Sequence, residues 1–386
     1  MPGAEYSRSG CRGVPPNMIV FVNSDLRIGG AETLRATVCR ELRRRGVDFM
    51  VVNLESAGDL AADLSDEGAA IMSLGCSKSI YRSLTTWKLA RMLARLGPQV
   101  VQSGQFNSNF HARVAGKLAR VPVIITEEHG FNTWKGPHHR MIDRSLSRWC
   151  HRVVAVSGAV KRQVIRDTGL ADERVEVLHN CVDAHLFGEM PSQTEARHAM
   201  GLNDDAFVVG HVGTLRAEKG HATLLRAFRL AAGTTWRLVL VGDGPLRGKL
   251  EGLAGELGID EQVIFLGSRR DVPAVLPALD VFAFPSVSEG LGIAVLEAMW
   301  TGLPVVVTDE GGLPEIVDHD RTGLVFPTAD AEALAHNLKT LSAQPELARR
   351  LGHEAKIYAM RHHSPSAYVD ALLDLHRRCL EERRPA

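Results

Sequence analysis

The segment 285–317 holds the residues best suited to chemistry, two glutamates eight positions apart, Glu289 and Glu297. The pattern predicts a strand, then a loop that carries Glu289, then a helix that carries Glu297 about two turns from its start. Both carboxylates can therefore face one pocket. Gly290 and Gly292 allow close backbone approach, and the exposed N–H groups at the start of the helix suit a phosphate. Taken alone, the pair also fits a glycosidase-type acid and nucleophile, or a solvated glutamate beside a helix-capping one.

A second acidic and glycine-rich turn follows the next predicted strand directly. It contains Glu310, Gly311, Gly312 and, after Pro314, Glu315. Loops that follow neighbouring parallel strands lie at the same edge of a sheet, so the two acidic loops are expected to converge. The sequence therefore predicts one ligand cleft at this edge.

A lysine in an earlier loop has a similar setting. Lys219 follows a predicted strand and lies between Gly213 and Gly220, with Arg216 close by. A lysine in a loop is usually only solvated, but the flanking glycines and the preceding strand favour a ligand site. We therefore place Lys219 in the predicted cleft.

These motifs resemble those of glycosyltransferase family 4, whose members are retaining enzymes of the GT-B fold. The donor-site signature of that family is two glutamates separated by seven residues and followed by a G-x-P-E turn, which Glu289, Glu297 and residues 312–315 match. Four further stretches agree with the family: IGGAET (28–33), GTLRAEKGH (213–221), VGDGPLR (241–247) and FLGSRRDV (265–272). The resemblance covers nearly the whole chain.

The resemblance implies a role for each matched residue. Glu289 contacts the transferred sugar and Glu297 holds the ribose hydroxyls, and both roles need a hydrogen-bond acceptor. Lys219 and Arg216 hold the donor diphosphate, where a charge-assisted bond strengthens as the glycosidic bond breaks. His129, in the sequence TEEHG, lies near the sugar and can donate a hydrogen bond to a hydroxyl. The expected catalytic residues are His129, Arg216, Lys219 and Glu289.

The residues expected to bind the donor come from several loops. Backbone N–H groups at Gly29 and Gly30, after the first predicted strand, can approach a diphosphate or sugar oxygens. Arg269 lies in a stretch that resembles the loop receiving the nucleobase and can stack on the base. The full expected set is Gly29, Gly30, Thr214, Gly244, Ser268, Arg269, Gly290, Leu291, Gly292, Ile293 and Glu297. Thr214 and Cys181 depart from the family, which commonly has arginine and glycine there.

Short runs rich in Val and Ile alternate with helical stretches, which predicts parallel βαβ units. The expected fold is α/β, with two doubly wound Rossmann-like domains and an interdomain cleft. In the first half the runs begin at Met18, Phe49, Val100, Pro122 and Arg152, and the pattern restarts after Pro191. We expect a flexible leader over 1–17, an acceptor-binding domain over 18–190, a donor-binding domain over 191–365 and a C-terminal helix over 366–386 that crosses back to the first domain.

Composition narrows the classes of function. The 45 basic side chains equal the 45 acidic ones, and the small basic excess in the first half is too weak and dispersed for nucleic-acid binding. No apolar run is long enough to cross a membrane and the first residues lack a signal-peptide centre, which predicts a cytoplasmic protein. The six cysteines lack metal-site spacing, and Asp318 and Asp320 form a D-x-D that resembles a surface loop. We expect no metal and no covalent cofactor.

The expected partners are a nucleoside diphosphate sugar, with UDP favoured over GDP, and an acceptor hydroxyl recognised by the loops 103–109 and 131–139. Basic amphipathic helices in the first half most often pack against a sheet, and they leave peripheral contact with the inner face of a membrane open as a second role. A sugar-nucleotide epimerase, a phosphorylase and a non-catalytic nucleotide-sugar-binding subunit stay open as alternatives. A dinucleotide oxidoreductase is disfavoured, because no G-x-G-x-x-G follows the first strand. Glu127 and Glu128 are adjacent on a strand and cannot act jointly.

Overall fold

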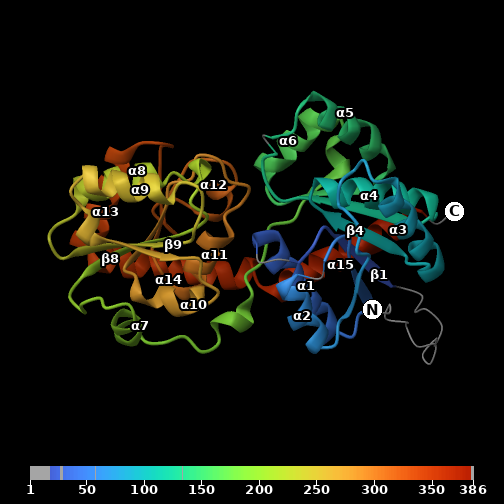
Figure 1. Ribbon diagram of the computed structural model, residues 1–386. Coiled ribbons are helices and arrows are strands. Elements are labelled where there is room, and N and C mark those ends of the chain that lie inside the picture. The colour runs from blue at the N-terminus through green and yellow to red at the C-terminus, as the bar shows by residue number, and fades with distance from the viewer. Residues whose placement is uncertain (1–17, 27–28, 57, 133, 384–386) are drawn as a thin grey trace, which may run out of the picture.

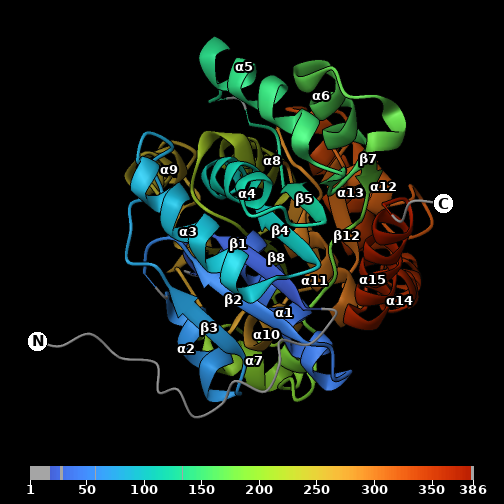
Figure 2. The same ribbon diagram turned by 90° about the vertical axis from the view of Figure 1, so that its right-hand side faces the viewer.

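The computed structural model describes residues 18–26, 29–56, 58–132 and 134–383, and it contains two parallel β-sheets in two domains that lie side by side (Figure 1). The expected leader, 1–17, lies outside these ranges. Helices flank both sheets, which confirms the predicted α/β fold with two doubly wound domains. Figure 2 shows the same arrangement with the N-terminal domain in front.

The N-terminal sheet has seven strands in the order β3-β2-β1-β4-β5-β6-β7. Its strands are β1 (Ile19–Asn23), β2 (Phe49–Asn53), β3 (Ala70–Ser73), β4 (Val100–Gly104), β5 (Val123–Glu128), β6 (Arg152–Ala155) and β7 (Val175–Val177). The helices that connect them are α1 (Gly30–Arg44), α2 (Asp59–Asp66), α3 (Ser83–Leu96), α4 (Phe106–Leu118), α5 (Pro137–Leu146) and α6 (Gly158–Thr168). The chain reverses its winding between β1 and β4, so a crevice opens there at the carboxyl ends of the strands.

The C-terminal sheet repeats this design with six strands in the order β10-β9-β8-β11-β12-β13. Its strands are β8 (Phe207–Val212), β9 (Trp236–Val241), β10 (Val263–Gly267), β11 (Val281–Phe284), β12 (Val305–Thr308) and β13 (Leu324–Phe326). Its helices are α7 (Gln193–Ala199), α8 (His221–Ala231), α9 (Arg247–Glu256), α10 (Val272–Val275), α11 (Ile293–Thr301), α12 (Leu313–Ile316), α13 (Ala331–Ala343) and α14 (Pro345–His362). The winding reverses between β8 and β11.

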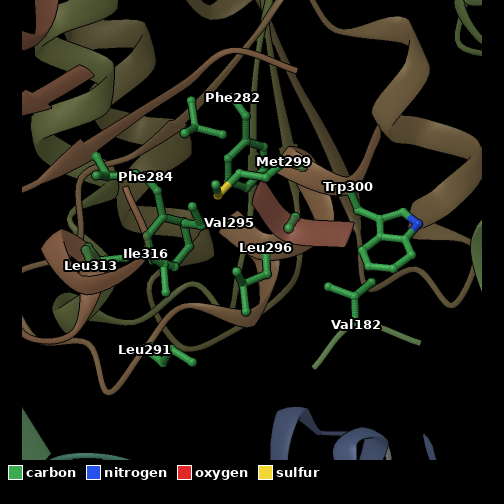
Figure 3. Packing of buried hydrophobic residues seen from close by; sticks show 14 of the residues in the cluster. Val182, Phe282, Phe284, Leu291, Val295, Leu296, Met299, Trp300, Leu313 and Ile316 are labelled. Carbon is green, nitrogen blue, oxygen red and sulfur yellow. The ribbon is translucent and has the colours of Figure 1, made fainter. Parts of the chain in front are cut away.

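The central strands are apolar because they are covered on both faces. Val208, Phe282 and Val305, for example, are fully buried in β8, β11 and β12. Helix α11 packs on this sheet through Val295 and Met299, among the side chains drawn in Figure 3. The cluster in Figure 3 therefore holds the start of α11 at the carboxyl edge of the sheet.

The last helix, α15 (Pro365–Glu381), packs on the N-terminal domain. Tyr368, Val369 and Leu372 are buried in one cluster with residues of β1 and α1. The chain thus passes between the domains twice, and the two passages are joined, because Val182 N–H donates to the carbonyl of His363 at 2.9 Å. The N-terminal core is completed by the end of the chain.

Cys181 lies in the first of these passages, where the family commonly has glycine. It is buried against α15 and does not have a positive φ angle, so the turn does not need glycine's freedom. The described cysteines, Cys39, Cys76, Cys150, Cys181 and Cys379, are all free thiols. In the described ranges, none of the helices combines the length and apolarity that crossing a bilayer requires.

Candidate active site between the domains

A cavity of about 440 Å³ lies between the two domains, where the carboxyl edges of both sheets meet. The N-terminal domain contributes the loop after β1, the residue that follows β5 and the first interdomain passage. The C-terminal domain contributes the loops after β8 and β11 and the first turns of α11. The predicted site residues that line it are Gly29, Gly30, His129, Thr214, Lys219, Glu289, Leu291, Gly292, Ile293 and Glu297.

An ion pair between Lys219 and Glu289 lies in this cleft. The two residues follow β8 and β11, the strands between which the winding of the sheet reverses. Both side chains are mostly buried, with relative exposures of 20% and 15%. Burial keeps the pKa values of His211 and His221, which lie beneath this loop, below their usual range, so they are neutral near pH 7. The positive charge on the side of the cleft formed by the loop after β8 therefore comes from Lys219.

Short backbone contacts place Lys219 next to Glu289. Ser286 Oγ and Val287 N–H each donate to the carbonyl of Glu218, both at 2.8 Å. Gly220 has a φ of +67°, and a Cβ there would lie 1.8 Å from the carbonyl oxygen of Pro285. Only glycine allows the lysine loop to lie this close to the end of β11.

The second glycine-rich turn supports Glu289 from the other side. A Cβ on Gly311 would lie 1.9 Å from the carbonyl oxygen of Glu289, and one on Gly312 would lie 2.2 Å from that of Gly290. Gly290 in turn packs against the carbonyl of His129, where a Cβ would lie at 2.5 Å. The two turns converge through their backbones, and Gly290 serves as an interdomain contact rather than as part of the cleft wall.

Glu297 lies one turn into α11 rather than the expected two, because the helix begins only at Ile293, and both residues lie on the same side of the helix. Burial raises the pKa of its carboxyl group to about 7, and the nearby carboxylate of Asp183 contributes to this rise. The described residues form no hydrogen bond with the Glu297 carboxylate, so its acceptor capacity is free for a ligand.

Glu315, from the G-x-P-E turn, binds the N-terminal domain. Its carboxylate accepts hydrogen bonds from the N–H groups of Gly158 at 2.8 Å and Ala159 at 3.0 Å, at the start of α6, and lies 3.0 Å from His179 Nε2. Burial alone would raise the pKa of Glu315, but these contacts outweigh it and hold that pKa below its usual range. Glu315 therefore caps a helix of the other domain.

His129 is held by a buried polar network in the N-terminal domain. Its Nε2 lies 2.8 Å from Glu127, which also accepts hydrogen bonds from Arg35 at 2.6 Å and from Gln102. Gln102 in turn lies 2.6 Å from His376 of α15. Burial would raise the pKa of Glu127, but Arg35 and His129 outweigh it and hold that pKa below its usual range, so Glu127 is an anion. The Nδ1 atom of His129 is buried and has no hydrogen-bond partner among the described residues.

Besides Gly290, four residues expected at the site do not line the cleft. Arg216 is solvent-exposed and does not line the cleft with Lys219, while the preceding Leu215 is buried in the core. Gly244 packs on the backbone of Leu215, where a Cβ would lie 2.7 Å from the carbonyl oxygen. Ser268 is exposed, and Arg269 is paired with Asp271.

Two acidic residues at the site were not selected from the sequence. Glu127 and Glu128 do not act together, as the sequence predicted, because the carboxylate of Glu128 accepts a hydrogen bond from Asn132 at 2.5 Å. The contact between Glu127 and His129 was not predicted. Glu32 lies in the first turn of α1 beside Gly29 and accepts a hydrogen bond from Gln105. An acidic residue in a first helical turn is common for electrostatic reasons alone, so its position in the sequence does not mark it.

The D-x-D residues Asp318 and Asp320 are exposed, and Asp318 pairs with Arg321. They do not line the cleft. In the part of the chain that the structure describes, no group of three or more His, Cys, Asp or Glu side chains is arranged to hold a metal ion.

Two Rossmann-like domains that enclose a cleft with a lysine and two carboxylates define a GT-B architecture. The family model for glycosyltransferase family 4 matches residues 28–186, and the model for glycosyl transferases group 1 matches residues 192–358. Together these matches cover most of the chain, which belongs to the family 4, group 1 glycosyltransferases. The protein is a transferase enzyme.

Individual relatives agree with this assignment. The lipopolysaccharide core biosynthesis glycosyltransferase LpsD of Rhizobium meliloti is 27% identical over 92% of this chain and 97% of its own. The D-inositol 3-phosphate glycosyltransferase of Saccharomonospora viridis is 36% identical over 59% of this chain and 56% of its own. The crystal structure of HepE from Anabaena, in complex with UDP and glucose, has a TM-score of 0.84 at 22% identity, covering 94% of this chain and 100% of HepE.

Proposed function

We propose that this glycosyltransferase moves a sugar from a nucleoside diphosphate sugar, with a UDP sugar favoured over a GDP sugar, to an acceptor hydroxyl with retention of the anomeric configuration. The observation that carries the proposal is the meeting of Lys219, Glu289 and Glu297 in one cleft. The HepE structures with UDP and with UDP-glucose support the donor class, because their fold is similar.

The ion pair between Lys219 and Glu289 suggests how the donor enters. A diphosphate attracts Lys219, and a sugar hydroxyl can donate to the carboxylate of Glu289. The donor therefore replaces the ion pair between these side chains with one contact from each of them to the ligand. The N–H groups at the start of α11, beside Gly292 and Ile293, add further donors for the phosphate. As the glycosidic bond breaks, the charge on the leaving phosphate grows and its bond to Lys219 strengthens, which lowers the barrier.

The other residues position the donor and the sugar. Glu297 accepts hydrogen bonds from the ribose hydroxyls, and His129, oriented by Glu127, contacts the sugar from the opposite domain. The loop after β10, with Ser268 and Arg269, remains our candidate for the nucleobase. Holding both substrates between the domains excludes water and so favours transfer over hydrolysis.

The donor class is tested by a panel of UDP, GDP and ADP and their sugars in a thermal-unfolding assay. A ligand at 100 times its Kd stabilises the fold by ~2.7 kcal/mol. We expect UDP to raise the unfolding temperature most. Transfer activity should survive EDTA, because in this proposal Lys219 rather than a metal neutralises the diphosphate. NMR of the product should show that the anomeric configuration is retained. Stabilisation by none of these nucleotides would contradict the proposal.

The roles of the two glutamates predict different kinetic defects. Glu289→Gln should lower kcat by about 10²-fold to 10³-fold, because its contact is made to the reacting sugar. Glu297→Ala should mainly raise KM for the donor, by about tenfold or more, since it removes ribose contacts. Glu346→Gln, an exposed glutamate of α14 that does not line the cleft, is the matched control and should leave both constants unchanged. Wild-type kinetics in both cleft variants would refute the assignment.

The raised pKa of Glu297 predicts a pH dependence of donor binding. Below pH 7 the carboxyl group is mostly protonated, and donor binding to the carboxylate must first remove this proton. The Kd for the nucleotide should therefore rise as the pH falls through 7, by up to about tenfold per pH unit, and level off above 7. Calorimetric titration from about pH 5.5 to 8.5 measures this. Glu297→Gln should remove this component, and an unchanged profile in that variant would exclude Glu297 as its source.

We further propose that the acceptor is a hydroxyl on a glycan, a lipid carrier or a small aglycone, presented at the cytoplasmic face of a membrane. The free thiols fit a reducing compartment. Tyr81, Leu84 and Trp87, at the start of α3, have large apolar side chains that are 55% to 75% exposed, and Trp134 is 57% exposed in the loop after β5. Helices in such units begin at the carboxyl edge of the sheet, so these side chains border the acceptor side of the cleft.

Vesicle flotation tests this membrane contact. The double variant Tyr81→Ser, Trp87→Ser should float with anionic vesicles at least about threefold less than the wild type, because it removes exposed apolar area. Leu230→Ser, an exposed leucine of the C-terminal domain, is the control and should float like the wild type. A wild-type protein that stays with the soluble fraction would contradict the membrane proposal without affecting the donor assignment.

A further inference from the structure

A second cavity, of about 680 Å³, lies at the opposite edge of the N-terminal sheet from the donor cleft. Its walls include Pro122, which precedes β5, and His151, which precedes β6. The end of α4, the turn that contains Trp149 and the last turn of α15 complete it. Because the amino ends of these strands face it, this cavity is separate from the proposed transfer site.

The walls of this cavity carry an excess of positive charge. One carboxylate, Glu382, is outnumbered by six cationic side chains, those of Lys117, Arg120, Arg148, Arg152, Arg174 and Arg383. Glu382 is itself paired with Arg152 at 2.5 Å. Across the described ranges, no carboxylate pairs with Lys117, Arg120 or Arg148.

Two of the guanidinium groups bind only neutral atoms in the described structure. Arg174 donates to the backbone carbonyls of Cys150 and His151, and Arg383 Nε lies 2.9 Å from His151 Nε2. These contacts hold the side chains in place but leave their charges uncompensated. The charges of Arg174 and Arg383 therefore lack a counterion among the described residues.

The ring of His151 shows the same shortage of acceptors. Its Nδ1 faces the N–H of Ile124 at 3.0 Å, and its Nε2 faces Arg383. A neutral imidazole has one acceptor nitrogen, so it cannot accept from both donors. Burial and the charges of Arg383 and Arg174 lower the pKa of His151 to about 4, which makes the ring neutral at pH 7. An anion beside Nε2 would supply the missing acceptor.

We propose that this basic pocket is a second ligand site that binds a phosphate-bearing anion. Arginine forks match phosphate oxygens in geometry and charge, and the cationic groups here come from four separate segments that surround one space. The volume exceeds that of a single phosphate and suits a diphosphate or a phosphorylated headgroup. The ligand is a free phosphate compound or the headgroup of an anionic lipid, and both share the chemistry that these residues recognise.

Pyrophosphate binding, measured by calorimetry, tests the site. Lys219→Ala serves as the background, so that the donor cleft does not contribute. In that background Lys117→Ala with Arg148→Ala should weaken pyrophosphate binding at least about tenfold, because two charge-assisted contacts are lost. Both side chains are exposed, so the fold should persist, as a thermal-unfolding midpoint would show. Arg226→Ala with Arg229→Ala removes the same charge from exposed positions of α8 and should change the Kd less than about twofold.

Flotation with phosphatidylglycerol vesicles distinguishes the two sources. If the ligand is a lipid headgroup, Lys117→Ala with Arg148→Ala lowers flotation relative to the α8 pair. If it is a free compound, flotation is unchanged while pyrophosphate binding is lost. Both results support a phosphate site. Equal pyrophosphate binding by the two double variants, together with equal flotation, would overturn it.

Discussion

The contact between Lys219 and Glu289 is the interaction on which the cleft depends. Each side chain is mostly buried, and each would be costly to bury without a partner of opposite charge. The pair therefore keeps the cleft polar and charged. It also keeps the cation and the carboxylate at the place where a charged phosphate and a sugar hydroxyl can take over their contacts. Both residues follow strands at the reversal point of the sheet, where the fold leaves room for a ligand.

The second requirement is that the two domains face each other correctly. Glu315 caps α6 across the interface, and Gly290 packs on the backbone of His129. The hydrogen bond from Val182 N–H to the carbonyl of His363 also joins the two passages of the chain between the domains. These interactions involve backbone groups, which have fixed directions, so they define the relative position of the domains more sharply than apolar packing would.

The N-terminal domain supports the cleft from within. The network from His376 through Gln102 and Glu127 to His129 links α15 to the site, and Arg35 balances the buried charge of Glu127. A helix at the end of the chain thus contributes to the orientation of a histidine at the cleft. At the opposite edge of the same sheet, α15 ends beside the basic pocket. The helix is therefore next to one proposed ligand site and is linked to the other through this network.

The sequence by itself determined the class of fold and the core of the site. All six strands of the C-terminal sheet and five of the N-terminal sheet are apolar runs, while β3 and β7, at the edges, are short and partly exposed and carry no such pattern. The spacing around Glu289 and Glu297 was enough to place both at one cleft, because the loop after a strand and the first turns of the next helix lie at the same edge of the sheet. Tertiary structure alone decided that Arg216 does not line the cleft, that Glu315 binds the other domain, that Glu127 holds His129, and that basic residues from four segments share a pocket. These outcomes depend on contacts between residues far apart in the chain, about which local periodicity and spacing hold no information.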